Sequence, residues 1–82
     1  MVTTKEDIRG WLERGKEKNA THVVVMCDSF DYQDYPVFIE SHENIHTRLQ
    51  ELAKGEMQRI MEVYKLSMPW NLQLNEHRAY HL

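Results

Sequence analysis

The chain has 82 residues, of which 41% are hydrophobic and 28% are charged, and it contains a single cysteine. These values are typical of one folded domain, and a lone cysteine excludes an internal disulfide and so a disulfide-stapled scaffold. The longest apolar run, residues 23–27, is too short to span a membrane, and the first residues lack a signal-peptide pattern. We therefore expect a cytoplasmic protein with no membrane partner.

The formal net charge of −3 arises in the middle third of the chain. Residues 21–46 contain five acidic residues and no lysine or arginine, whereas the segments before and after them each carry five basic and four acidic residues. A nucleic-acid interface needs a clustered basic face, which this distribution does not provide. We therefore expect no nucleic-acid partner.

The first expected element is a helix that begins after Thr3 or Thr4. Either hydroxyl can cap the helix, and an acidic residue three positions later can complete a capping box. Asn19 suits the left-handed conformation that often ends a helix. One face of this helix carries the residues expected to pack against the protein interior, with a glycine as a close-packing position: Ile8, Trp11, Leu12 and Gly15.

Two strands are expected next. Residues 22–27 are apolar and β-branched without alternation, so we expect both faces of that strand to be covered. Residues 36–40 form the second strand, with Pro36 at its start, where a proline is tolerated. The polar stretch between them is too short for a helical crossover, which predicts an antiparallel hairpin 22–27/36–40.

The second half of the chain has the spacing of helices. Ser41 can cap a helix whose apolar positions 45, 49, 52 and 53 share one face, and positions 57, 60, 61 and 64 continue that face. Residues 41–66 can form one helix or two, and we favour a break near Gly55. A short helix over residues 70–79 should follow Pro69.

The predicted fold is α+β, a single domain over residues 1–82 in the order α-β-β-α-α, with a short C-terminal helix. A small antiparallel sheet is packed by helices. The expected core consists of Ile8, Trp11, Val23, Val25, Val37, Ile39, Ile45, Leu49, Leu52, Ile60 and Met61.

Residues 42–46 read His-Glu-Asn-Ile-His and match the H-E-x-x-H motif of zinc hydrolases. In that motif the two histidines bind the metal and the glutamate activates water. Here a cap at Ser41 would place His42 and His46 at a helix start, where free backbone N–H groups disfavour a cation, and no further Gly or His extends the motif. We interpret the segment as a solvated helix start, with no catalytic residue and no cofactor. The alternative is a zinc-dependent hydrolase that uses His42, Glu43 and His46.

Cys27 ends the most apolar strand, so we expect a buried and unreactive thiol, whose pKa the neighbouring Asp28 would raise. His77 and His81 would share a face if the C-terminus were helical. Together with the first histidine pair they could then bind zinc or nickel. We prefer the interpretation of a loosely held C-terminus that carries free imidazoles.

The loop 28–35 has the most unusual composition, because aspartates recur every three residues with aromatic residues between them. In one interpretation the aspartates form local turns and the rings pack on the sheet edge. In the other the loop is a docking surface, because exposed aromatic rings beside charges suit protein recognition. The residues of that surface would be Phe30, Asp31, Tyr32, Asp34 and Tyr35.

The sequence of the same hairpin is similar to that of a group of known proteins. The run Ala-Thr-His-Val-Val-Val-Met-Cys-Asp at 20–28, then Phe30 and Asp-Tyr-Pro-Val at 34–37, resembles small uncharacterised proteins of bacteriophages and bacteria. The resemblance covers the first half of the chain and continues weakly into the helices. It implies no activity, cofactor or catalytic residue, and it marks the strand–loop–strand unit as the hallmark of that family.

The favoured function is a non-enzymatic protein-interaction module that acts through the acidic and aromatic hairpin loop. A two-stranded sheet leaves unpaired edges. In addition, Val24 and Met26, with Phe38 on their face, need a cover from the first helix, the C-terminal segment or another subunit. We therefore expect a homodimer joined through the sheet.

Overall fold

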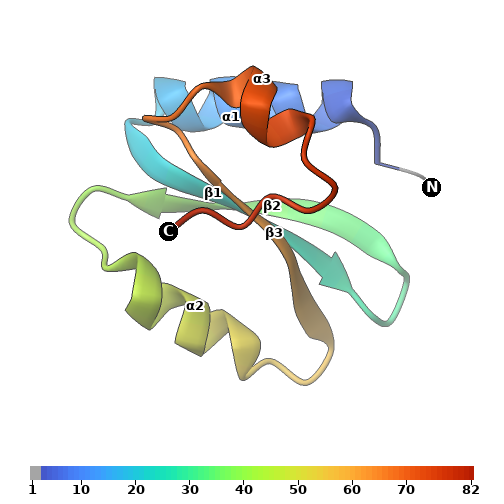
Figure 1. Ribbon diagram of the computed structural model, residues 1–82. Helices are drawn as coiled ribbons and strands as arrows, with labels where there is room; N and C mark the ends of the chain where they lie inside the picture. Colours follow the sequence, from blue (N-terminus) through green and yellow to red (C-terminus); the bar gives the residue numbers. More distant parts are fainter. Residues whose placement is uncertain (1–2) are drawn as a thin grey trace.

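The chain alternates helices and strands in the order α-β-β-α-β-α, as seen in a computed structural model that describes residues 3–82 (Figure 1). The elements are α1 (Lys5–Glu17), β1 (Ala20–Asp28), β2 (Gln33–Glu40), α2 (Ile45–Ala53), β3 (Gln58–Lys65) and α3 (Trp70–Leu74). Within the described range the strands form one antiparallel sheet in the order β2-β1-β3. The α+β class and the predicted hairpin are confirmed. The element order is not, because residues 58–65 form a third strand where a helix was expected after Gly55.

β3 was predicted as a helix because a β-bulge disturbs its alternation. β1 pairs Val25 with Glu62 and Met26 with Ile60, so Met61 is an extra residue between two paired positions. The bulge turns Met61 outward, where 38% of its surface is exposed, and the prediction that it belongs to the core is wrong. The spacing of apolar residues along this segment therefore resembles that of a helix, although the segment is a strand.

The first helix begins and ends as predicted. The Thr4 hydroxyl accepts a hydrogen bond from the Asp7 N–H, and the Asp7 carboxylate accepts one from the Thr4 N–H, so the capping box is complete. Gly15 is buried against the sheet. Asn19 adopts the left-handed conformation, with φ 60°, directly after the helix.

The second helix starts later than predicted. Asn44, rather than Ser41, is its N-cap, and its side chain accepts a hydrogen bond from the Thr47 N–H at 3.1 Å. The helix ends at Ala53, just before Gly55, so the predicted break at this glycine is confirmed. α3 is shorter than the predicted range 70–79.

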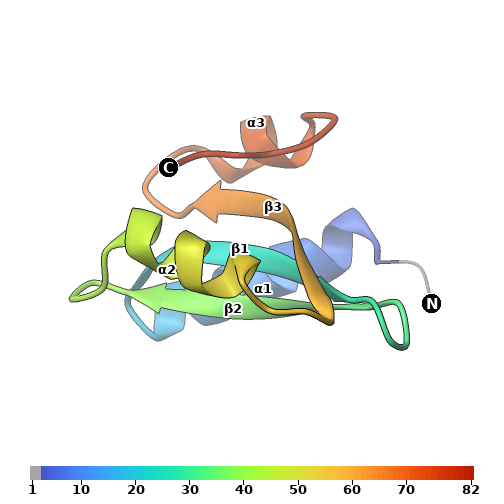
Figure 2. The ribbon, with the colours of Figure 1, turned by 90° about the horizontal axis from the view of Figure 1, so that it is seen from below.

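The helices lie on opposite faces of the sheet, with α1 and α3 on one face and α2 on the other (Figures 1 and 2). The first face is packed by Ile8, Leu12, Val23, Val25, Tyr64, Leu74 and Ala79, and the second by Val24, Met26, Ile39, Leu49 and Val63. All the predicted core residues except Met61 belong to these clusters or pack against them. Each Å² of apolar surface that these clusters remove from water stabilises the folded domain by roughly 25 cal/mol.

The cover of the Val24–Met26 face differs from what was expected. α2 of the same chain packs on this face, not the first helix, the C-terminal segment or a second subunit. Phe38 lies opposite Val23 in the β1–β2 pairing and packs on the α1 face instead. An uncovered sheet face therefore no longer supports the expected dimer.

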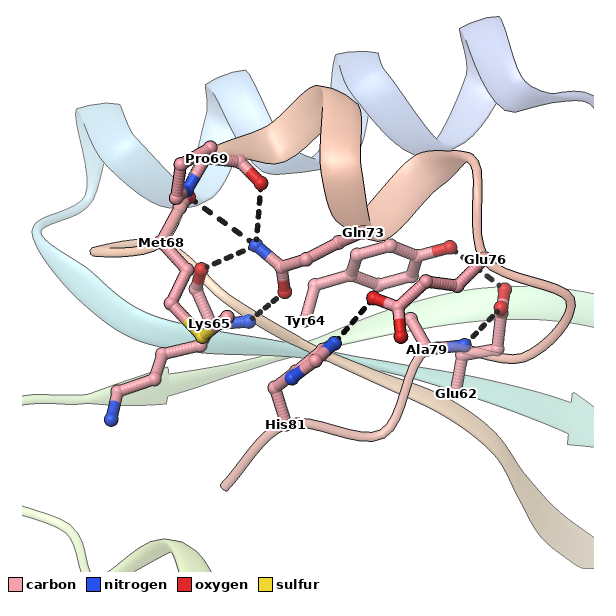
Figure 3. Close-up of polar contacts among 9 residues, drawn as sticks. All are labelled: Glu62, Tyr64, Lys65, Met68, Pro69, Gln73, Glu76, Ala79 and His81. Carbon is pink, nitrogen blue, oxygen red and sulfur yellow. Dashed lines mark hydrogen bonds and ion pairs between the residues drawn. The ribbon is translucent and has the colours of Figure 1, made fainter.

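A buried polar network holds the C-terminal quarter on β3 (Figure 3). Gln73, which is fully buried, accepts a hydrogen bond from the Lys65 N–H at 2.8 Å and donates one to the Lys65 carbonyl at 2.9 Å. The Gln73 amide therefore forms the two hydrogen bonds with the backbone of Lys65, the last residue of β3, that a neighbouring strand would form.

The segment after α3 also pairs with β3. The Val63 N–H donates to the Ala79 carbonyl and the His81 N–H donates to the Val63 carbonyl, both at 3.0 Å, so residues 79–81 cover part of the outer edge of β3. His81 pairs with Glu76 instead of extending a helix from His77. The C-terminus is not helical there, so a histidine pair on one helix face does not form.

Among residues 3–82, no helix combines the length and apolar character that a membrane span requires.

Candidate functional site

Two large aromatic side chains project into solvent from the loop that joins β1 and β2. Phe30 is 79% exposed and Tyr32 is 72% exposed. Rings of this size are usually at least half buried, because each removes a large apolar area from water. The interpretation in which the rings of this loop pack on the sheet edge is therefore wrong for Phe30 and Tyr32.

The backbone that carries these rings is held by the aspartates. Asp28 Oδ1 accepts a hydrogen bond from the Phe30 N–H at 2.8 Å, and Asp31 Oδ1 accepts one from the Gln33 N–H at 3.2 Å. The Asp28 carbonyl also accepts from the Tyr32 N–H at 2.7 Å. These are the local turns predicted for the aspartates. The rings are therefore presented by an ordered loop.

Tyr32 occupies a backbone conformation that its residue type disfavours. Its φ is 57°, in the left-handed region, where a residue with a bulky side chain is a genuine outlier. Asn19 has nearly the same φ, but asparagine is among the residues that tolerate it. The left-handed position in the loop is thus filled by an exposed aromatic residue, although Gly or Asn would be less strained there.

A third apolar side chain extends this surface. Met57 lies in the turn between α2 and β3 and is 52% exposed. Its carbonyl accepts a hydrogen bond from the Ser29 N–H at 2.9 Å, which ties this turn to the loop. Figures 1 and 2 both show the two connections at the same end of the sheet. We call Phe30, Tyr32 and Met57 the tip surface.

The structure separates the remaining residues of the predicted docking surface. Asp31 stays at the tip, but Tyr35 turns onto the α2 face, where its hydroxyl donates a hydrogen bond to Gln58 Oε1 at 2.7 Å. Burial raises the pKa of the Tyr35 hydroxyl. Asp34 lies opposite Cys27 in the β1–β2 pairing, on the face of the sheet that carries α1. Tyr35 therefore has a packing role, and Asp34 belongs to a different part of the surface.

Asp34 lines a cleft of about 410 Å³ between the first half of α1 and the start of β2. We call this hollow the α1–β2 cleft. Its lining residues are Thr3, Glu6, Asp7, Gly10, Trp11, Arg14, Gln33 and Asp34. Sequence reasoning missed it, because Trp11 was assigned to the core and Gly10 gave no signal. Trp11 is only half-buried and also faces the cleft.

Cys27 is buried and offers no accessible nucleophile, as predicted. Burial raises the pKa of its thiol, and the nearby Asp34 carboxylate raises it further. A thiol nucleophile needs the opposite environment, with a cation or a base beside it.

The H-E-x-x-H segment does not form a two-histidine helix face. His42 lies in the turn before α2, whereas His46 lies inside that helix. His42 is instead close to two carboxylates, because possible ligand atoms of Glu40, His42 and Glu43 lie within 4.8 Å of one another. The Glu43 carboxylate, however, forms an ion pair with Arg48 at 2.8 Å. A metal ion at this exposed turn would have to compete with that guanidinium.

Comparisons with known proteins offer no relative to set beside this geometry. No family model, curated protein or solved structure matches the chain.

Proposed function

We propose that this protein is a non-enzymatic interaction module that docks onto a partner protein through its tip surface. The observation that carries the proposal is the exposure of Phe30 and Tyr32 on a loop whose backbone is fixed by hydrogen bonds. A fixed loop loses little conformational entropy on binding, and buried aromatic residues dominate the energy of most interfaces.

The charge around the tip surface defines the kind of partner. Asp28 ends β1, Asp31 lies in the loop that follows it, and the whole segment 21–46 lacks lysine and arginine. A partner with a basic rim around an apolar pocket would complement this surface and would be steered toward it. The turn at Glu40, His42 and Glu43 supports the alternative of a zinc-dependent hydrolase less well, because the two histidines of the motif lie on different elements.

An affinity capture from the native host tests the proposal with matched variants. The immobilised double variant Phe30→Ala/Tyr32→Ala should lose a partner that the wild-type protein retains, and its melting temperature should stay near the wild-type value because both side chains are exposed. Leu72→Ala is the control, since Leu72 is 66% exposed on α3, away from the loop. If the double variant captured the same partners in the same yield, the tip surface would not be the docking site.

A further inference from the structure

The α1–β2 cleft combines an aromatic wall with an excess of negative charge. Trp11 lines it together with three carboxylates, those of Glu6, Asp7 and Asp34, and one guanidinium, that of Arg14. None of the ion pairs formed among residues 3–82 involves Glu6, Asp34 or Arg14. The Asp7 carboxylate accepts the Thr4 N–H in the capping box, so the Trp11 indole and the Glu6 and Asp34 carboxylates are the groups that a ligand can use, and the lining favours a cation.

Gly10 keeps the cleft open. A Cβ atom built on this residue meets no other atom within 4 Å, so a side chain at this helix position would project into the open space. Glycine normally weakens a helix interior, and packing does not require it here. The absence of a side chain at Gly10 instead leaves room beside Trp11 for an incoming group.

The cleft begins where the loop of the tip surface ends. Gln33, which lines the cleft, directly follows Tyr32 in the chain and pairs with Asp28 in the hairpin. A segment bound across the tip surface can therefore continue along the start of β2 toward α1. Asp34 also lines a second hollow, beside Ile8 and Val25.

We propose that the α1–β2 cleft binds an arginine side chain from a basic segment of the partner protein. A guanidinium group can stack its flat face on the Trp11 indole while its N–H groups donate to the Asp34 and Glu6 carboxylates. Arginine suits this lining better than lysine, because its charge is planar and can use the ring and a carboxylate together. This proposal rests on the proposed function, since it names the chemistry of that partner.

The binding of a small arginine probe can be followed at the two tryptophans by NMR spectroscopy. The probe is the peptide Ac-Gly-Arg-Gly-NH₂, and the neutral control peptide has citrulline in place of arginine. The Trp11 indole N–H should shift saturably on addition of the arginine peptide. The Trp70 indole N–H, which donates to the Leu66 carbonyl at 3.2 Å, is an internal control and should not shift.

Substitutions in the cleft separate specific binding from general attraction to an acidic protein. Gly10→Leu should abolish binding because its side chain fills the cleft, whereas Gly10→Ala adds one methyl group and should retain it. Asp34→Asn should weaken binding on the order of tenfold through loss of one charge-assisted hydrogen bond. Glu13→Gln removes the same charge from an exposed residue of α1 outside the cleft and should leave binding unchanged.

The results distinguish this proposal from the function on which it rests. The variant Phe30→Ala/Tyr32→Ala should still bind the arginine peptide, because the cleft is intact in it. Equal shifts with the citrulline peptide, unchanged binding by Gly10→Leu, or no shift at Trp11 would each overturn the cleft as an arginine site. None of those outcomes would bear on the tip surface, which the capture experiment tests separately.

Discussion

The same substitution at two glycines of α1 should change stability in opposite directions. At Gly10 an added methyl group meets nothing, so Gly10→Ala should raise the free energy of unfolding by about 1 kcal/mol through helix propensity alone. At Gly15 the added Cβ would lie 2.9 Å from Val23 Cγ2 and 3.1 Å from Leu66 Cδ1. Val23 is fully buried in the central strand and its χ1 angle is stiff, so it cannot move aside at low cost.

Overpacking of this kind typically costs about 1–3 kcal/mol, which exceeds the propensity gain, so Gly15→Ala should lower the stability by about 1 kcal/mol or more. Urea unfolding of both variants followed by tryptophan fluorescence measures the difference. For a domain of this size, each 1 kcal/mol corresponds to a change in melting temperature of about 4–8 °C. If Gly15→Ala were as stabilising as Gly10→Ala, α1 would not pack on β1 as closely as described.

Three further predictions concern the sheet. Gln73→Leu leaves the Lys65 N–H without a partner, whereas the Lys65 carbonyl still accepts a hydrogen bond from the Met68 N–H. The substitution should cost about 1–3 kcal/mol in urea unfolding, and a loss below about 0.5 kcal/mol would contradict the role of this amide. Burial, together with a hydrogen bond to Glu62, raises the pKa of the Tyr64 hydroxyl, so the folded state holds this proton more tightly than the unfolded chain. Stability should therefore be full below the ordinary tyrosine pKa of about 10 and fall as the pH rises past it, with a smaller fall in Tyr64→Phe during an alkaline titration. Because α2 covers the Val24–Met26 face, the chain should sediment as a monomer at micromolar concentration, and a dimer mass would contradict this expectation.

Local signals were enough to predict the first half of the fold. The capping box of α1 and the stop at Asn19 involve residues close together in the sequence, and the unbroken apolar run of β1 reports a strand that is covered on both faces. The short polar connection then allows only a hairpin between β1 and β2. Each of these features depends little on the rest of the molecule.

The second half depends on tertiary structure. The bulge at Met61 is set by the pairing of β3 with β1, and in the sequence alone it produces a helical spacing. Both Ser41 and Asn44 are good N-caps, and only the position of α2 on the sheet decides between them. The spacing of apolar residues therefore favours a helix over residues 58–65, and strand pairing overrides this local preference.

The candidate sites also differ in how far the sequence alone could predict them. The composition of the loop identified Phe30 and Tyr32, because the signal lies within a few residues. The α1–β2 cleft joins Gly10 and Trp11 of the first helix to Asp34 of the second strand, and this neighbourhood exists only once α1 lies across the sheet. The cleft could not be predicted because its residues are far apart in the sequence, and their chemical types alone gave no signal.

Tyr32 provides the most direct test of whether the loop is shaped for binding at the expense of stability. A residue with a bulky side chain in the left-handed region costs about 1–2 kcal/mol, and an exposed ring regains little of this by packing. Tyr32→Asn keeps the backbone conformation but relieves the strain, so it should stabilise the protein by about 0.5–1 kcal/mol in urea unfolding. The same variant should weaken partner capture more than tenfold, because truncated aromatic anchors typically cost at least that much in an interface. If the variant bound the partner as well as the wild-type protein, the strained and exposed Tyr32 ring would have no role in binding, and Tyr32 would no longer belong to the docking surface.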